Sequence, residues 1–353
     1  MDLTKYLSPH VIQSADAIGR QFEQAKPFRH VVIDDFFQPE FCESLLQEFP
    51  AFDEKLATDE NGNIGRKAVH QGVAHLGEHY RRLDALVKSQ SFRDMVTRLT
   101  GIEDLHYDPH YFGGGTHNNL DGQDLDPHVD FTHHPITGLH RRMNLIVYLN
   151  KEWEKEWGGN IELHKDPYRP PEEDEIVSVE PLFNRAVIFE TNDISWHGFP
   201  RINLPEDKKH LSRKSFALYY YTPTRPEKIR PHSTIYVERH LPAHIREGHT
   251  LTSEDEALIK TLLARRDQHL KRLYATITDL TDENQRLRAE AQIRQLSQRH
   301  TGKAPAVHET QIQAALAQMG QDKQALLARI QALENSTSWR VTAPLRALRR
   351  WFQ

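Results

Sequence analysis

The stretch Asp126-Pro127-His128-Val129-Asp130 decides how the rest of the chain is interpreted. His128 and Asp130 are two positions apart, and on an extended strand the side chains at i and i+2 point to the same face. An imidazole and a carboxylate therefore converge on one point. A second imidazole, from His197 further along the chain, would complete three donors that cover one side of an octahedral ion and leave the other side open.

The chemistry of these donors favours iron over a thiolate-bound metal. Two imidazoles and one carboxylate are the ligand set of non-haem Fe(II) sites, and the only cysteine, Cys42, lies far upstream. A single His-x-Asp pair is weak evidence in a chain with 22 histidines. His133, His134 and His140 are accordingly expected to be surface or hydrogen-bonded histidines.

Length and composition set the outer bounds. A chain of 353 residues predicts about two domains, and 38% hydrophobic with 27% charged residues is typical of a globular protein. The net charge of −5 gives no reason to expect nucleic acid as a partner. One cysteine excludes an internal disulfide framework. The start of the chain has no signal-peptide core, and the longest apolar runs hold about five residues against the roughly 20 that span a bilayer. We therefore expect a cytoplasmic protein.

Hydrophobic periodicity predicts an α+β fold. Residues 30–34 are expected to form a buried strand, and residues 39–49 and 80–100 helices that support a sheet. Further strands are predicted at 106–112, 144–149, 160–163, 176–179, 185–189 and 214–222, which together suggest an antiparallel sandwich or barrel. Trp157-Gly158-Gly159-Asn160 is expected to turn with positive φ. Gly113-Gly114-Gly115 is expected to be a flexible loop, and it lacks the spacing of a phosphate-binding loop.

These motifs, in this order, resemble the 2-oxoglutarate/Fe(II)-dependent oxygenases, and within them the prolyl-4-hydroxylase-like branch. The matching segments are 31–37, 128–130, 144–153, 157–159, 183–189, 196–198 and 213–220. The resemblance implies a double-stranded β-helix, or jelly-roll, core at about residues 105–240 with supporting N-terminal helices. It also implies an enzyme that uses Fe(II), 2-oxoglutarate and O₂, with ascorbate as a further candidate.

The same resemblance assigns roles to further residues. His128, Asp130 and His197 would bind the iron, and Arg213 would hold the distal carboxylate of 2-oxoglutarate, because a guanidinium grips a carboxylate with two bonds. Strand alternation places Ser215 on the face of Arg213, where its hydroxyl could add a hydrogen bond. Tyr148 would line the 2-oxoglutarate pocket. Because the interval between His197 and Arg213 is longer than usual in the family, Arg201 and Lys214 are kept as alternative anchors.

In the C-terminal third, the sequence pattern changes from short strands to a long helix. Residues 226–250 are expected to form a strand and a linker, and Ser253 to Glu256 the capping box of a long helix. Heptad positions follow at Ile259, Leu263, Arg266, Leu270, Leu273, Ile277, Leu280, Asn284 and Leu287, and a second run at Ile312, Leu316, Met319, Leu326, Ile330 and Leu333. These predict a coiled coil that makes a homo-oligomer, with a helical hairpin as the alternative. The predicted domains are 1–245, 250–335 and a basic amphipathic tail at 336–353.

The tail, Asn335 to Arg346 and onward, resembles that of bacterial surface-polysaccharide enzymes. Arginines interleaved with Trp339, Trp351 and Phe352 could lie on the inner face of the cytoplasmic membrane, beside polysaccharide-assembly enzymes. We therefore expect hydroxylation of a sugar or lipid-linked glycan. The alternatives are a prolyl hydroxylase acting on a peptide or protein, a non-catalytic glycan-binding scaffold, and a cupin-like metal protein that does not use 2-oxoglutarate.

Overall fold

A computed structural model describes residues 1–57, 68–242, 244–299, 317–318, 320–325 and 328. By its internal contacts the chain divides into two units, Met1–Leu263 and Ala264–Gln353. The first unit holds all the strands of the described residues, in two sheets that are entirely antiparallel within their ladders. The predicted α+β architecture is therefore confirmed for this unit, and the arrangement is consistent with a jelly-roll core.

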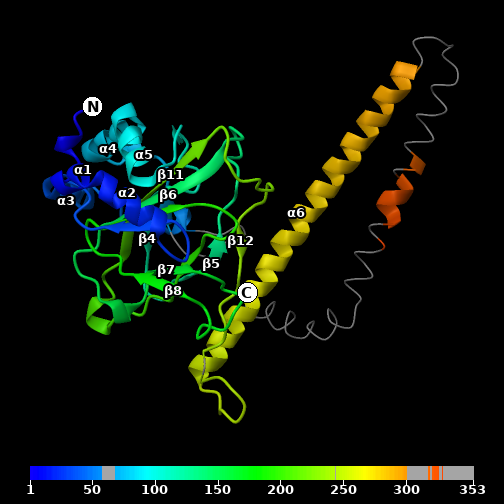
Figure 1. Cartoon of the computed structure of the whole chain (residues 1–353). Helices are drawn as coiled ribbons and strands as arrows, with labels where there is room; N and C mark the ends of the chain where they lie inside the picture. Colours follow the sequence, from blue (N-terminus) through cyan, green and yellow to red (C-terminus); the bar gives the residue numbers. More distant parts are fainter. Residues whose placement is uncertain (58–67, 243, 300–316, 319, 326–327, 329–353) are drawn as a thin grey trace. The chain divides into compact units, whose positions relative to one another are not determined.

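The larger sheet forms the wall against which the helices pack (Figure 1). Its strands run in the order β1-β9-β6-β11-β4-β2, and β3 also pairs with β11. Their bounds are β1 His30–Ile33, β2 Ala68–His70, β3 His106–Tyr107, β4 Gly115–Asn119, β6 His140–Tyr148, β9 Ala186–Glu190 and β11 Arg213–Thr222. Alternation along β11 places Phe216, Leu218 and Tyr220 in the core beneath the helices. Ala217 and Tyr219 point to the opposite face.

The smaller sheet covers that opposite face. Its order is β12-β5-β10-β7-β8, with bounds β5 Leu125–Val129, β7 Ile161–His164, β8 Ile176–Val179, β10 Trp196–Phe199 and β12 Ile235–Tyr236. Ile161 and Leu163 of β7 pack with Tyr148 and Phe189 of the larger sheet, so an apolar layer joins the two sheets. Side chains from both sheets can therefore meet in the space between them.

Among the described residues, five α-helices come before β3: α1 Pro9–Gln13, α2 Ala15–Gln24, α3 Pro39–Gln47, α4 Glu78–Lys88 and α5 Gln90–Thr100. The prediction of one helix over residues 80–100 is wrong in one respect, because Ser89 divides it. Ser89 is extended, at φ −68° and ψ 147°, and its Oγ accepts a hydrogen bond from the Phe92 backbone N–H. A serine that caps the following helix ends the preceding one.

Two glycine positions show why the chain turns where it does. Gly158 has a φ of 72°, and a Cβ there would lie 2.0 Å from the Arg201 carbonyl oxygen. Gly115 has a φ of 101°, and a Cβ there would lie 2.2 Å from the His70 carbonyl oxygen. The turn predicted at residues 157–160 is therefore confirmed. The predicted loop at 113–115 is shorter, because Gly115 already belongs to β4.

The long helix α6, Ser253–Arg299, has its capping box one residue earlier than predicted, starting at Thr252 instead of Ser253. Thr252 and Asp255 form the box: the Thr252 N–H donates to Asp255 Oδ2, and the Asp255 N–H donates to Thr252 Oγ1. The heptad leucines and isoleucines of α6 from Leu263 to Leu287 are 41–63% exposed. The coiled coil stays a prediction, and the second heptad run and the tail at 336–353 lie outside the described residues.

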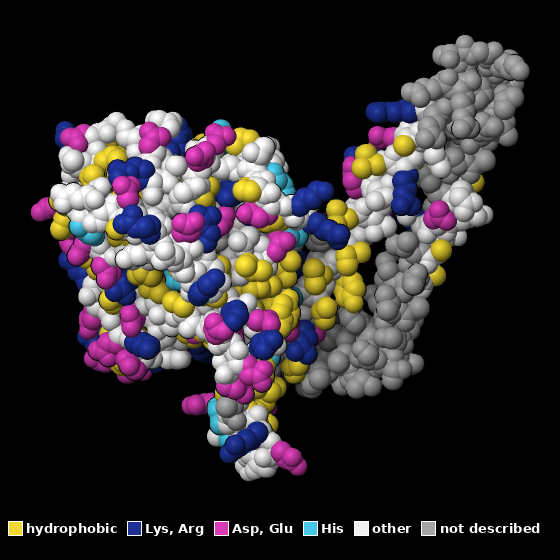
Figure 2. Space-filling view, viewed as in Figure 1, with side chains coloured by type: hydrophobic (Ala, Val, Ile, Leu, Met, Phe, Trp, Pro, Cys, Tyr) yellow, Lys and Arg dark blue, Asp and Glu magenta, His cyan; other side chains and the backbone are white. Residues whose placement is uncertain are grey.

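The outer surface of the first unit mixes charges of both signs on the face seen in Figure 2, where Lys and Arg lie among Asp and Glu. Among the described helices, none is both long enough and apolar enough to cross a membrane.

Candidate metal centre

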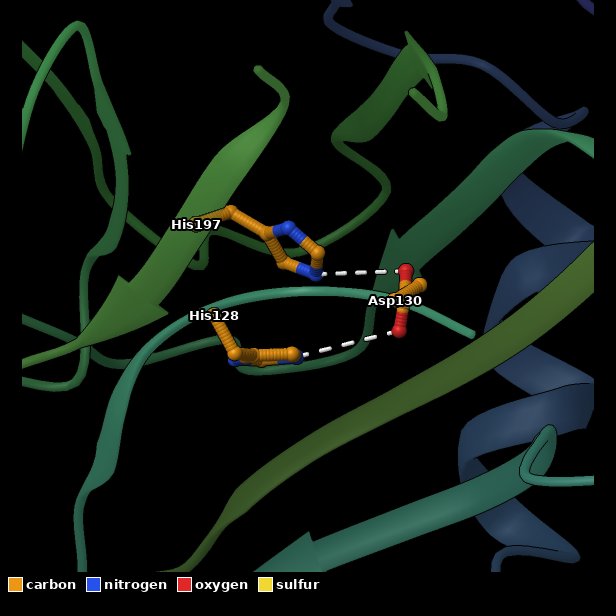
Figure 3. A group of neighbouring side chains, drawn as sticks. All are labelled: His128, Asp130 and His197. Carbon is orange, nitrogen blue, oxygen red and sulfur yellow. Dashed lines mark ion pairs between the residues drawn. The ribbon is translucent and has the colours of Figure 1, made fainter. Parts of the chain in front are cut away.

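His128 and His197 lie opposite each other on adjacent strands of the smaller sheet. His128 is near the end of β5, and His197 is its register partner on β10. Their ring centroids are 4.2 Å apart. Asp130, directly after β5, completes the group: His128 Nε2 lies 3.8 Å from Asp130 Oδ1, and His197 Nε2 lies 3.6 Å from Asp130 Oδ2 (Figure 3).

The hydrogen bonds of the two imidazoles direct one nitrogen of each ring toward the shared point. His128 Nδ1 lies 2.9 Å from the Asp126 carbonyl oxygen, and His197 Nδ1 lies 2.9 Å from the Ser195 carbonyl oxygen. A carbonyl only accepts, so each Nδ1 carries the proton and each Nε2 keeps its lone pair. Burial also lowers the pKa of His197, against the opposing influence of Asp130, which favours the neutral ring that a metal requires.

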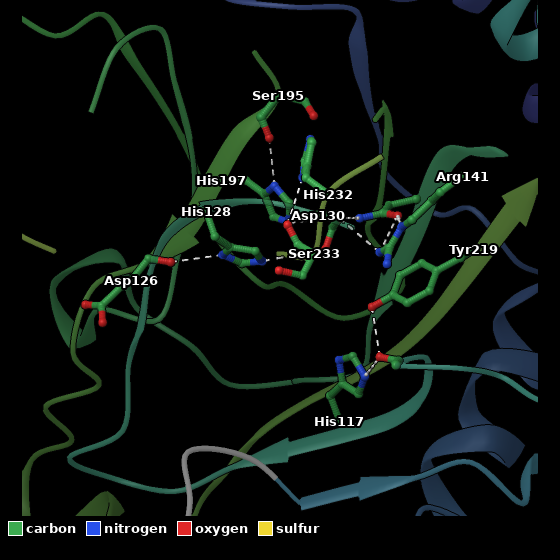
Figure 4. A network of polar contacts seen from close by, with 12 residues as sticks. His117, Asp126, His128, Asp130, Arg141, Ser195, His197, Tyr219, His232 and Ser233 are labelled. Atoms are coloured by element: carbon green, nitrogen blue, oxygen red, sulfur yellow. Dashed lines mark hydrogen bonds and ion pairs between the residues drawn. The ribbon is translucent and has the colours of Figure 1, made fainter. Parts of the chain in front are cut away.

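Two residues of β6, Arg141 and Asn144, hold Asp130. Figure 4 shows Arg141 beside the Asp130 carboxylate. Arg141 Nη2 and Asn144 Nδ2 each lie 2.9 Å from Asp130 Oδ2, and Asn144 Oδ1 in turn accepts from Arg141. Burial by itself would raise the pKa of Asp130, but Arg141 and then the two histidines lower it well below its usual range. The carboxylate is therefore ionised and fixed in orientation.

The predicted anchor residues meet on the larger sheet, on the face toward the smaller one. Arg213 is 5% exposed, its Nη2 donates to the Tyr148 hydroxyl at 3.2 Å, and its guanidinium carbon lies 4.2 Å from the Phe199 ring centroid. Ser215 is the register partner of Tyr148. Among the described residues, no carboxylate lies within ion-pairing distance of Arg213, and Ser215 Oγ is buried with no hydrogen-bond partner.

The two alternative anchors are placed differently. Arg201 is exposed. Lys214 lies on the opposite face of β11 from Arg213, and its Nζ donates to Ser212 Oγ at 2.8 Å. Neither side chain therefore shares the buried surroundings of Arg213 and Ser215.

These observations test whether Fe(II) and 2-oxoglutarate fit the residues present. Two imidazole nitrogens and one carboxylate, all within 4.8 Å of one another, match the donor preference of Fe(II). A buried guanidinium without a carboxylate and a buried hydroxyl without a partner are costly unless an anion satisfies both. The residues fit both groups.

Sequence reasoning missed Arg141 and Asn144. A signal was present, because Arg141 and Arg142 come just before the strand predicted at 144–149, and charged side chains that are buried beside such a strand require partners. It also missed Tyr236, which stacks on His128 at 5.2 Å. The three histidines expected to be ordinary lie outside the ligand group: His134 pairs with Asp108 at 3.2 Å, and His133 packs against His140 at 4.3 Å.

Comparisons with known proteins bear on this geometry. Residues 114–221 match the family model of the 2OG-Fe(II) oxygenase superfamily. A curated relative, prolyl 3-hydroxylase OGFOD1 of Mus musculus, is 24% identical over 244 residues, which are 65% of this chain. The chain spans only 38% of the length of that relative.

Solved structures of low identity also resemble the chain. A prolyl hydroxylase of Trichoplax adhaerens, in complex with a hypoxia inducible factor peptide fragment, has a TM-score of 0.42 and 17% identity, covering 61% of this chain and 93% of its own. A prolyl 4-hydroxylase of Phytophthora capsici has a TM-score of 0.42 and 19% identity, covering 72% and 74%. HygX of Streptomyces hygroscopicus, with nickel and 2-oxoglutarate bound, has a TM-score of 0.38 and 14% identity, covering 61% and 87%.

The family match contains β5, β6, β10 and all of β11 except Thr222, and these strands carry or adjoin the His-Asp-His group and Arg213. Residues 114–221 therefore form a 2OG-Fe(II) oxygenase domain, and the residues present fit the Fe(II) and 2-oxoglutarate for which this family is named.

Proposed function

We propose that the protein hydroxylates a prolyl residue in a peptide or protein, with Fe(II) at His128, Asp130 and His197 and 2-oxoglutarate at Arg213. The main support for this chemistry is that two sites, each lacking a ligand, lie on the facing sides of the two sheets. One is a converging donor group. The other is a buried cation beside an unsatisfied hydroxyl.

Each residue has a defined task in this proposal. His128 and His197 present Nε2 lone pairs, because backbone carbonyls hold their Nδ1 protons. Arg213 and Ser215 hold the distal carboxylate of 2-oxoglutarate through charge-assisted hydrogen bonds. The hydroxyl of Tyr148 orients Arg213. Burial raises the pKa of Tyr148, with Arg213 opposing, so this phenol remains protonated at neutral pH.

When bound, Fe(II) and 2-oxoglutarate would supply the oxidation, in which one oxygen atom of O₂ ends in succinate, released with CO₂, and the other in the new hydroxyl group of the substrate. Arg141 and Asn144 position Asp130, because both hydrogen-bond to its Oδ2.

Two observations support a prolyl substrate. The relative that aligns over 65% of this chain is a prolyl 3-hydroxylase. Aromatic side chains also flank the ligand group, as Tyr236 stacks on His128 and Phe131 packs against the 40%-exposed Phe112 at 5.4 Å. Apolar and aromatic linings suit an apolar ring such as proline. The glycan prediction rests on the tail at 336–353, outside the described residues, and no comparison supports it.

The test is succinate release coupled to 2-oxoglutarate consumption, with prolyl peptides, free proline, nucleotide sugars and glycans offered in turn. We expect turnover with prolyl peptides and a mass gain of one oxygen atom on proline. His128→Ala and Asp130→Ala should abolish both stoichiometric Fe(II) binding and turnover. Robust turnover with glycans and none with any prolyl peptide would reject the prolyl substrate. Turnover at the wild-type rate in the alanine variants would reject the metal centre.

A further inference from the structure

A second group of metal-ligating side chains lies apart from the oxygenase centre, at the start of α6. His244 Nε2 lies 2.7 Å from Asp255 Oδ1, and His249 Nε2 lies 2.9 Å from Asp255 Oδ2. The two imidazole centroids are 5.3 Å apart. All three residues belong to the first unit of the chain. Each ring therefore aims a nitrogen at the same carboxylate, one at each oxygen.

The carboxylate is already fixed by groups that are not part of the cluster. The Thr252 backbone N–H and its Oγ1 hydroxyl both donate to Asp255 Oδ2 at 2.9 Å, as part of the cap of α6. Hydrogen bonds that orient a ligating carboxylate are a regular feature of metal sites, because they remove the freedom that binding would otherwise have to restrict. Asp255 is 5% exposed, while the His244 side chain is 56% exposed. The site is thus open on one side, toward solvent.

We propose that His244, His249 and Asp255 form a second metal site, for Zn²⁺, independent of the iron centre. Imidazole nitrogen and carboxylate oxygen are ordinary zinc ligands, and three protein ligands with one open position is a common zinc arrangement. Donors around a tetrahedral Zn²⁺ stand about 3.3 Å apart, given bond lengths of about 2.0–2.2 Å. Each imidazole therefore has to move back from the carboxylate by about half an ångström to admit the ion.

The charges near Asp255 and the tautomers open to the imidazoles favour binding of Zn²⁺. A cation at a helix N-terminus opposes the helix dipole, but Asp255 is flanked by Glu254 and Glu256, so the first turn carries three acidic residues. Binding needs an Nε2 lone pair on each ring. The exposed His244 can adopt the tautomer in which Nδ1 carries the proton and donates it in a hydrogen bond to water. The bound ion would tie the segment before α6 to the first turn of that helix.

Zinc stoichiometry in full-length, metal-free protein tests the proposal, since both sites take Zn²⁺. Titration against a colorimetric chelator should give two equivalents in the wild type and one in His249→Ala. The loss should not occur in His240→Ala, a matched control in which an exposed neighbouring histidine is removed. His128→Ala should also bind one equivalent, through the cluster alone.

Cobalt substitution distinguishes the two sites by a second readout. A four-coordinate Co²⁺ site absorbs visible light far more strongly than a six-coordinate one, so the intense bands should persist in His128→Ala and vanish in His249→Ala. Circular dichroism confirms that each variant is folded, and Asp255→Asn, which keeps a capping side chain, should lose the bands as well. Equal zinc stoichiometry in wild type and His249→Ala would overturn the proposal and leave the cluster as a hydrogen-bonded helix cap. If His249→Ala bound one equivalent of zinc fewer than the wild type and His128→Ala bound as much as the wild type, the result would contradict the iron centre and leave the second metal site supported.

Discussion

Arg141 is an ion-pair partner of Asp130 and is at the same time enclosed by aromatic rings. Its Nη2 lies 2.9 Å from Asp130 Oδ2, and its guanidinium carbon lies 3.5 Å from the Tyr219 ring centroid and 4.5 Å from that of Phe131. The Tyr219 hydroxyl donates to the Gly113 carbonyl, which fixes the ring that supports the arginine. Because the Arg141 guanidinium is stacked on these rings, its position is fixed, and it holds the Asp130 carboxylate in one place.

Replacing Arg141 should therefore destabilise the metal-free protein more than the metal-bound one. Arg141→Met leaves the Asp130 carboxylate buried without its cation, which typically costs about 3–5 kcal/mol. A divalent ion at the same carboxylate restores the compensation, so Mn²⁺ should raise the melting temperature of this variant more than that of the wild type. Arg142→Met is the matched control, since Arg142 lies next to Arg141 on β6 but pairs with Glu190 of β9 instead of Asp130. Equal metal-induced stabilisation in Arg141→Met and wild type would contradict this prediction.

Arg213→Ala should weaken 2-oxoglutarate binding while iron binding is retained. Loss of a buried, charge-assisted partner of the distal carboxylate is worth about 2–5 kcal/mol. Anaerobic titration of 2-oxoglutarate into the Fe(II) protein measures the change, and Lys214→Ala on the opposite face of β11 is the control. An unchanged affinity in Arg213→Ala would move the anchor to Arg201 or Lys214.

Ser215→Ala should separate binding from stability. Because Ser215 Oγ has no partner, removing it should leave the free energy of unfolding of the ligand-free protein unchanged or slightly higher. The affinity for 2-oxoglutarate should fall by about 1 kcal/mol, the value of one hydrogen bond. Urea unfolding with and without 2-oxoglutarate measures both. If Ser215→Ala lowered the free energy of unfolding of the ligand-free protein and left the affinity for 2-oxoglutarate unchanged, Ser215 would have a packing role only.

Glu48 links two helices in a way that predicts a pH dependence of stability. Its Oε2 accepts from the His79 and Tyr80 N–H groups at the start of α4, and its Oε1 contacts His79 Nδ1 at 2.8 Å. Burial would raise the pKa of Glu48, but these hydrogen bonds lower it below 4.5. A depressed folded-state pKa means that the stabilisation is complete above about pH 4.5 and is lost as the pH falls below it.

Glu48→Ala should accordingly lower the free energy of unfolding by about 1–2 kcal/mol at pH 7, the range of a helix N-cap. The difference between wild type and variant should shrink as the pH is lowered below 4.5. Urea denaturation at a series of pH values measures it. A difference that stays constant over this series would mean that the Glu48 carboxylate makes no net contribution.

The exposed heptad positions of α6 predict self-association. Ile277 and Leu280 are 55% and 63% exposed, and an apolar seam of this kind is normally covered by a second helix. Ile277→Glu combined with Leu280→Glu should convert an oligomer to a monomer in light scattering, while Ala275→Glu, off the seam, should not. Wild-type protein that is already monomeric would reject the coiled coil.

Local rules account for much of this molecule. Strand alternation put His128 and Asp130 on one face and Arg213 and Ser215 on another, because side-chain direction repeats every two residues regardless of what packs nearby. The same rule separated Lys214 from Arg213. The break at Ser89 escaped prediction because apolar periodicity runs through it, and only the capping geometry shows that the chain is extended there.

The tertiary structure alone decided which distant residues meet. His197 faces His128 because β10 pairs with β5 in one register, and a shift by one residue would turn the imidazole to the other side of the sheet. Arg141 reaches Asp130 from the other sheet, and His244, His249 and Asp255 meet through a loop of irregular conformation. Sequence period determines the direction of a side chain within its element, whereas its partners depend on how sheets stack and loops close, which no local pattern encodes.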